Sequence, residues 1–228
     1  MLDYRVLVQA RMTSSRLPGK MLVNLDGRPL IDHVLSRVQD SCPSGQVVLL
    51  TSDDPTDDPL VEYVSKMVDI TIFRGELNNV YNRYVAFLDS NWCDWFVRIS
   101  GDSPLLDPNL IRKMVRMINE EYDLVTNILK RTFPAGQSVE VVKSRSFVEL
   151  PTEMLTEEDQ EHVTRYFYRN PDSFKILSVV ADNVSIGKEQ FVVDTREDLL
   201  SIEQMLMRQP DVGQGYAELT RLENDCDG

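Results

Sequence analysis

The sequence predicts an α/β protein with a mostly parallel sheet, and three features of its pattern indicate this class. Short apolar runs of strand length alternate with amphipathic stretches of about ten residues. Several of the apolar runs end in polar loops that contain Gly, Ser or Asp. No internal repeat or low-complexity segment interrupts the alternation. Strands joined by helices of this length form βαβ units with right-handed crossovers and parallel strands.

Four strands are predicted in the first half, each from a run of apolar and often β-branched residues. The first contains Val6, Leu7 and Val8 and follows the N-terminus closely. Nearly continuous apolar runs are typical of strands that are buried on both faces of a sheet. The four strands are expected at residues 5–9, 47–50, 70–73 and 95–99.

Four helices are predicted between and after these strands, because their apolar residues recur at the spacing of one helix face. They are expected at residues 29–38, 60–67, 78–88 and 108–118. Pro29 suits the first turn of the first helix, where a backbone N–H has no partner to lose. Asp107 directly precedes the fourth helix, and its carboxylate can cap the first turn.

The pattern changes after about residue 132. Strands are predicted at 139–142 and 174–177 around a helix at 157–168, and a last strand at 191–193 leads into a helix at 197–207. We interpret residues 132–188 as a small inserted, β-containing subdomain on the same sheet. The chain is thus divided into one domain over residues 1–208 and a flexible acidic tail over residues 209–228.

Composition excludes several classes of protein. The chain has 24 Lys and Arg against 37 Asp and Glu, a net charge of −13, so phosphate-driven binding of nucleic acid is not expected. No apolar run approaches the roughly 20 residues of a membrane span, and the N-terminus lacks the layout of a signal peptide. Three widely spaced cysteines are typical of a reducing cytoplasm.

The loop at residues 11–20 is the strongest functional signal. It follows the first strand and carries three cations and no acid in an otherwise acidic chain. Arg forks, a Lys point charge and backbone N–H groups near Ser and Gly suit a compact polyanion such as a triphosphate. The residues concerned are Arg11, Ser14, Ser15, Arg16, Gly19 and Lys20. The P-loop spacing is not met, and a solvated basic loop is the alternative.

Carboxylates follow two of the predicted strands. Asp102 and Asp194 come at strand ends, where a pair of carboxylates could hold one Mg²⁺ together with phosphate oxygens. The alternative for Asp102 is a turn that organises backbone, and for Asp194 it is helix capping. The acidic run 53–58 is interpreted as a solvated turn, with Asp53 close enough to the sheet edge to contact a base or ribose. His162 is interpreted as a structural helix residue.

Together these residues resemble the sugar cytidylyltransferases. The segment 9–20, QARMTSSRLPGK, is similar to the signature loop of that family, and most similar to its spore-coat polysaccharide (SpsF-like) branch. This branch is related to the CMP-Kdo and CMP-acylneuraminate synthetases. The resemblance extends from residue 5 to about residue 207. Further landmarks are GRPL at 27–30, RG at 74–75, NVYNRY at 79–84, RISGDSPL at 98–105, EHVT at 161–164 and VDT at 193–195.

The resemblance implies a three-layer, Rossmann-like nucleotidyltransferase domain of the glycosyltransferase-A type. It implies CTP as the nucleotide, Mg²⁺ held by Asp102 and Asp194, and a homodimer formed through the segment 132–188. We expect Arg11, Lys20 and Asp102 to act in catalysis, with the Ala10 backbone and Asp53 reading the base. The expected activity forms a CMP-activated sugar for surface polysaccharide, with release of pyrophosphate.

The sugar acceptor is expected to be an acidic 2-keto sugar. Gln137, Glu140 and Arg165 are predicted to contact it. The sequence departs from the branch in two places that are expected to lie near the acceptor, at residues 134–140 and 190–192. Two other functions stay open from the sequence, a glycosyltransferase that consumes a nucleotide sugar and a non-catalytic nucleotide-binding module.

Overall fold

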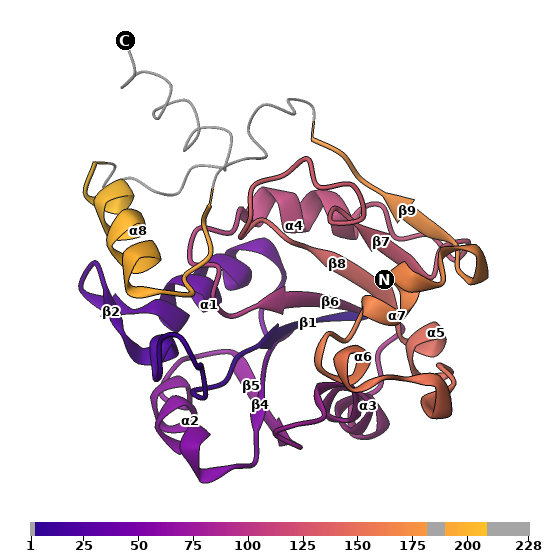
Figure 1. Cartoon of the computed structure of the whole chain (residues 1–228), viewed down its shortest axis with the longest axis horizontal. Helices are drawn as coiled ribbons and strands as arrows, with labels where there is room; N and C mark the ends of the chain where they lie inside the picture. The colour runs from indigo at the N-terminus through magenta and orange to yellow at the C-terminus, as the bar shows by residue number, and fades with distance from the viewer. Residues whose placement is uncertain (1–2, 182–189, 209–228) are drawn as a thin grey trace.

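A seven-stranded sheet forms the centre of the protein (Figure 1). The computed structural model describes residues 3–181 and 190–208. The strand order is β5-β4-β1-β6-β8-β7-β9. The bounds are β1 Tyr4–Gln9, β4 Val47–Ser52, β5 Ile70–Gly75, β6 Trp95–Ser100, β7 Leu124–Thr126, β8 Glu140–Lys143 and β9 Ile176–Ser178. A separate two-stranded ribbon pairs β2 Asn24–Leu25 with β3 Arg28–Pro29.

The sheet is mostly parallel, as predicted. β1 pairs in parallel with β4 and with β6, β4 with β5, and β7 with β9. β8 pairs antiparallel with both β6 and β7, so it alone among the seven strands runs in the opposite direction. The segment 132–188 therefore contributes β8 and β9 to the main sheet, with β7 between them.

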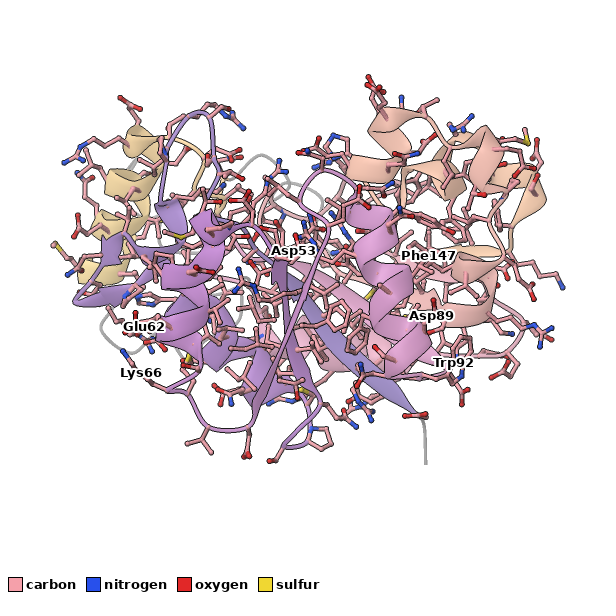
Figure 2. The ribbon with its side chains drawn as sticks, turned by 90° about the horizontal axis from the view of Figure 1, so that it is seen from below. Asp53, Glu62, Lys66, Asp89, Trp92 and Phe147 are labelled. Atoms are coloured by element: carbon pink, nitrogen blue, oxygen red, sulfur yellow. The ribbon has the colours of Figure 1, made fainter. Side chains whose placement is uncertain are left out.

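Helices cover both faces of this sheet. Their bounds are α1 Leu30–Ser41, α2 Asp58–Val64, α3 Val80–Ser90, α4 Pro108–Val115, α5 Ser144–Val148, α6 Glu157–Glu161, α7 Arg165–Arg169 and α8 Arg196–Arg208. Short 3₁₀ turns lie at Lys20–Leu22, Pro55–Asp57, Thr152–Met154 and Pro171–Ser173. Figure 2 shows Glu62 of α2 and Asp89 of α3 on opposite sides of the strands. None of the helices in the described residues is long and apolar enough to cross a membrane.

The core consists of two apolar clusters, one on each face of the sheet. Val6 and Val8 of β1 pack into the cluster that also contains buried residues of α1, α2, α4 and α8. Leu7 points the other way, into a cluster with α3, α5 and α7 that includes Phe96 and Phe147. Alternation along a strand places successive side chains on opposite faces, so the two clusters confirm the three-layer arrangement.

Two predicted elements differ in the structure. The helix expected at 157–168 is broken into α6 and α7 by His162, whose backbone leaves the helical region at φ −102° and ψ 71°. The turn brings Val163 into the core, while the residues of α6 are mostly acidic and only Glu157 and Glu158 are exposed. The strand expected at 191–193 is absent. Phe191 and Val193 are buried against the first cluster instead, and Val193 N donates to the carbonyl of Asp102 at 2.9 Å.

The ends of β1 and β6 meet at the point where the strand order reverses. From β1 the chain builds outward through β4 and β5, and then returns to the other side of β1 with β6. Gly101 N donates to Gln9 O at 2.8 Å, and a Cβ on Gly101 would lie 2.7 Å from the Cβ of Ala10. Only glycine permits this approach. Ligands of open α/β sheets bind in the crevice beyond such a reversal.

Candidate active site

The basic loop after β1 is held in shape by its own backbone and by a buried acid. Gly19, in the left-handed region at φ 74°, donates its N–H to the carbonyl of Met12 at 3.0 Å. Met12 N donates to Asp57 Oδ1 at 2.7 Å, and the other oxygen of Asp57 accepts from Thr51 and Ser52. Asp57 is fully buried, so it is an anchor for the loop. The interpretation of residues 53–58 as a solvated turn misses this role.

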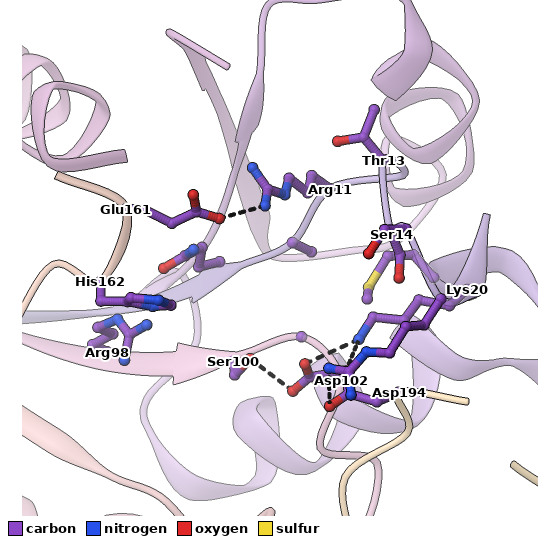
Figure 3. Close-up of a pocket in the computed structure, with 16 residues that line it drawn as sticks. Arg11, Thr13, Ser14, Lys20, Arg98, Ser100, Asp102, Glu161, His162 and Asp194 are labelled. Carbon is purple, nitrogen blue, oxygen red and sulfur yellow. Dashed lines mark hydrogen bonds and ion pairs between the residues drawn. The ribbon is translucent and has the colours of Figure 1, made fainter. Parts of the chain in front are cut away.

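A cavity of about 370 Å³ lies between this loop and the end of β6 (Figure 3). It is lined by most of the residues predicted to bind the nucleotide, namely Ala10, Arg11, Ser14, Ser15, Arg16 and Lys20. Asp102, Asp194, Glu161 and His162 are also among its lining residues. Gly19 shapes the loop without lining the cavity. We call this space the loop cavity.

The structure brings Asp102 and Asp194 together around one ammonium group. Lys20 Nζ donates to Asp102 Oδ2 at 3.1 Å and to Asp194 Oδ1 at 3.0 Å. The two arginines of the loop are also paired with acids. Arg11 lies 2.6 Å from Glu161, and Arg16 lies 2.8 Å from Asp194. Every predicted phosphate-binding cation thus faces a carboxylate.

A second cavity of about 370 Å³ adjoins the first. Four residues line both cavities: Arg98, Ser100, Asp102 and His162. We call this shared wall the seam. The second cavity is further lined by Arg131, Arg165 and Tyr168 together with Ala135, Gly136 and Ser138. Two spaces that share a wall with a carboxylate and an imidazole can hold two reactants side by side.

Arg98 is held at the seam by a buried acid. Its Nη1 lies 2.5 Å from Oε2 of Glu140, which is 1% exposed. Tyr168 donates its hydroxyl to the other oxygen of Glu140 at 2.5 Å, and lies 2.8 Å from the hydroxyl of Thr126. Burial alone would lower the pKa of Arg98, but the Glu140 charge raises it above its usual range. Burial, followed by the Glu140 charge, raises the pKa of Tyr168.

Besides Gly19, three predicted site residues line neither cavity. Glu140 lies behind the seam, where its carboxylate forms an ion pair with Arg98. Gln137 is fully buried, and its amide donates to Leu105 O at 2.7 Å and accepts from Asp107 N at 2.9 Å. It lines neither cavity, and its hydrogen bonds brace the backbone at Leu105 and Asp107. Asp53 is exposed and likewise lines neither cavity.

Arg165 lines the second cavity. Its guanidinium also pairs with Glu158 at 2.5 Å and with Asp159 at 3.0 Å. The sequence predicts a structural role for His162, but the residue lines both cavities, and Figure 3 shows its ring at the loop cavity. The signal for Arg98 was present in the sequence as a cation inside the apolar run of residues 95–99.

The donor set fits a hard divalent cation. Within the described residues no group of three or more His, Cys, Asp and Glu could form a complete protein site. Two carboxylates that converge on one point, beside a cationic loop for phosphates, are what Mg²⁺ uses when substrate and water supply its other ligands. Asp102 and Asp194 therefore fit such an ion.

A three-layer α/β fold that gathers a basic loop and two carboxylates at its central strand reversal defines a nucleotidyltransferase. The chain belongs to the cytidylyltransferase family, whose model matches residues 5–222. It is similar to the spore coat polysaccharide biosynthesis protein SpsF of Bacillus subtilis, with 31% identity over 97% of this chain and 94% of that protein. The chain is accordingly a CTP-dependent nucleotidyltransferase, as predicted.

Solved structures agree with this fold. A cytidylyltransferase from Leptospira borgpetersenii serovar Hardjo-bovis superposes with a TM-score of 0.93 at 25% identity, covering 100% of this chain and 96% of that one. A CMP:2-keto-3-deoxy-manno-octonic acid synthetase complexed with CTP has a TM-score of 0.68 at 14% identity, covering 91% of this chain and 99% of that one.

Proposed function

We propose that this enzyme transfers CMP from CTP to an acidic sugar and releases pyrophosphate, and that the product serves surface polysaccharide synthesis. The observation that carries the proposal is the seam, where Asp102, His162 and Arg98 face both cavities. CTP would occupy the loop cavity and the sugar the second cavity. The reacting atoms would then meet at the shared wall.

In the loop cavity, the cations would bind the triphosphate. Arg11, Arg16 and Lys20 would contact its oxygens, and backbone N–H groups near Ser14 and Ser15 would approach it closely. These contacts stabilise the charge that develops on pyrophosphate as it leaves. Positioning and electrostatic stabilisation are the main contributions a protein makes to such transfers.

Asp102 and Asp194 would hold Mg²⁺ next to the α-phosphate. When bound there, the ion would neutralise charge on the transferring phosphate group and lower the pKa of the attacking hydroxyl. Ser100 Oγ donates to Asp102 Oδ1 at 2.7 Å and fixes the orientation of that carboxylate.

The second cavity favours an anionic acceptor. Three arginines line it, Arg98, Arg131 and Arg165. Of its lining residues only Asp102, at the seam, is acidic. An arginine fork binds a carboxylate in a bidentate manner, so an acidic 2-keto sugar suits this wall. Its anomeric oxygen would bond to the α-phosphorus as the bond to the pyrophosphate oxygen breaks. His162, which lines both cavities, would accept the hydroxyl proton.

The test is pyrophosphate release with Mg²⁺ from CTP, UTP, ATP and GTP, each with keto-sugar acids, neutral sugars and sugar phosphates. We expect release with CTP and a keto-sugar acid only. Release with neutral sugars alone would overturn the acidic acceptor. Release of a nucleoside diphosphate from a nucleotide sugar would favour a glycosyltransferase.

A further inference from the structure

Lys20 holds a position between two carboxylates that a divalent cation would also need. Its Nζ donates to Asp102 Oδ2, to Asp194 Oδ1 and, at 2.9 Å, to the carbonyl of Val193. Lys20 is only 7% exposed. The ammonium therefore has three oxygen acceptors, and Figure 3 shows its bonds to the two carboxylates.

The other oxygen of each carboxylate is engaged as well. Asp102 Oδ1 accepts from Ser100 and, at 3.3 Å, from Ser103. Asp194 Oδ2 lies 2.8 Å from a guanidinium nitrogen of Arg16. Mg²⁺ binds oxygen at about 2.0–2.1 Å in a strict octahedral geometry. It cannot be coordinated by both acids while the ammonium stays between them, and two cations so close repel each other strongly.

We infer that the Lys20 ammonium and the divalent cation compete for Asp102 and Asp194. When a triphosphate binds, its oxygens replace the two carboxylates as partners of the ammonium, and the carboxylates are then available to the metal. This inference rests on the proposed function, because it assumes a triphosphate in the loop cavity. It goes further by making metal and nucleotide binding mutually dependent through one side chain.

The backbone of Lys20 stays fixed during this exchange. Its N–H donates to Leu17 O at 3.2 Å, and its carbonyl accepts from Val23 N at 3.2 Å. The exchange is therefore a rotation of the flexible four-carbon side chain. A buried ammonium needs an anionic partner wherever it points, and phosphate oxygens supply one. Metal alone binds weakly, and each ligand tightens the other by the same factor.

The experiment measures Mn²⁺ binding without nucleotide, from the electron paramagnetic resonance signal of free Mn²⁺. Lys20→Met removes the ammonium between the two carboxylates and leaves the pair of Arg16 and Asp194 in place, so we expect the Kd for Mn²⁺ to fall by about tenfold or more. Adding Asp102→Asn to that variant should abolish the gain. The matched control is Lys66→Met, whose lysine pairs with Glu62 at 3.2 Å on the surface and should bind Mn²⁺ like the wild type.

Unchanged or weaker Mn²⁺ binding by Lys20→Met would overturn the inference. Lys20→Gln provides a second, polar variant should the methionine form fail to fold, and wild-type protein that binds Mn²⁺ as tightly as Lys20→Gln overturns the inference equally. The proposed function is tested separately by wild-type pyrophosphate release. If the wild type releases pyrophosphate but the Lys20 variants bind Mn²⁺ no more tightly, the competition is refuted and the proposed function is not affected.

Discussion

Arg98 and Glu140 form an ion pair across adjacent antiparallel strands, with 2.5 Å between Nη1 and Oε2. They are direct partners in the register of β6 and β8. Arg98 faces both cavities, whereas Glu140 is buried behind it. The reversed strand β8 therefore supplies the acid that orients a cation at the seam.

Removing the acid of this pair should destabilise the protein. Glu140→Gln leaves the guanidinium of Arg98, whose side chain is 19% exposed, without its counter-charge, and we expect a loss of about 3 kcal/mol. Urea unfolding followed by circular dichroism measures the loss. The exposed pair of Arg145 and Glu149, at 2.9 Å, provides the control, and Glu149→Gln should change the stability by less than about 1 kcal/mol. Equal effects from the two variants would refute a structural role for the buried pair.

Asp102→Asn should lower turnover by about a hundredfold or more and leave the fold intact. The amide keeps the size of the carboxylate but loses the charge that would hold Mg²⁺ at the α-phosphate. Pyrophosphate release measures turnover, and the melting temperature reports the fold. Asp89→Asn, on the exposed surface of α3, should keep wild-type turnover. Near-normal turnover in Asp102→Asn would remove Asp102 from the metal role.

Glu161→Gln should strengthen CTP binding. Glu161 lies 2.6 Å from Arg11, and both side chains are partly exposed, at 46% and 35%. A neutral glutamine does not compete with phosphate for that guanidinium. The binding free energy of CTP should therefore become more favourable by about 1 kcal/mol, which lowers the Kd by about fivefold. Isothermal titration with CTP measures it. Weaker binding would instead show that Glu161 orients Arg11 for the nucleotide.

The free energy of unfolding should fall at acid pH because of Asp159, which lies in the first turn of α6. Burial would raise the pKa of Asp159, but hydrogen bonds from Thr156, Arg169 and Arg165 lower it to about 2, from 3.8. Because the folded pKa lies below the unfolded value, the ionised carboxylate stabilises the fold above about pH 4. That stabilisation, about 2 kcal/mol, is lost as the pH falls toward 2.

Asp159→Asn tests this dependence. The variant should unfold more easily at pH 6, and its stability should change less than that of the wild type between pH 4 and pH 2. Denaturant titration at several pH values measures both effects. Asp172→Asn, an exposed residue in a 3₁₀ turn, should follow the wild-type profile. Parallel profiles for wild type and Asp159→Asn would contradict the assignment.

Much of the fold follows from local patterns. The apolar run around Leu7 and the helix that starts at Leu30 were predicted within a few residues, because burial on one face sets a period that a sequence displays. The three-residue strand β7 was missed, since so short a run carries no period. The prediction of a strand at 191–193 is wrong, because apolar residues can be buried in a core without pairing with a strand.

The sequence by itself determined the class of fold and the basic loop, because periodicity and local charge are properties of neighbouring residues. Only the tertiary structure decided which acids meet which cations. Lys20 and Asp194 are 174 residues apart, and Arg98 and Glu140 are 42 apart. Such pairs depend on strand order and register, which long-range packing selects and no local pattern encodes.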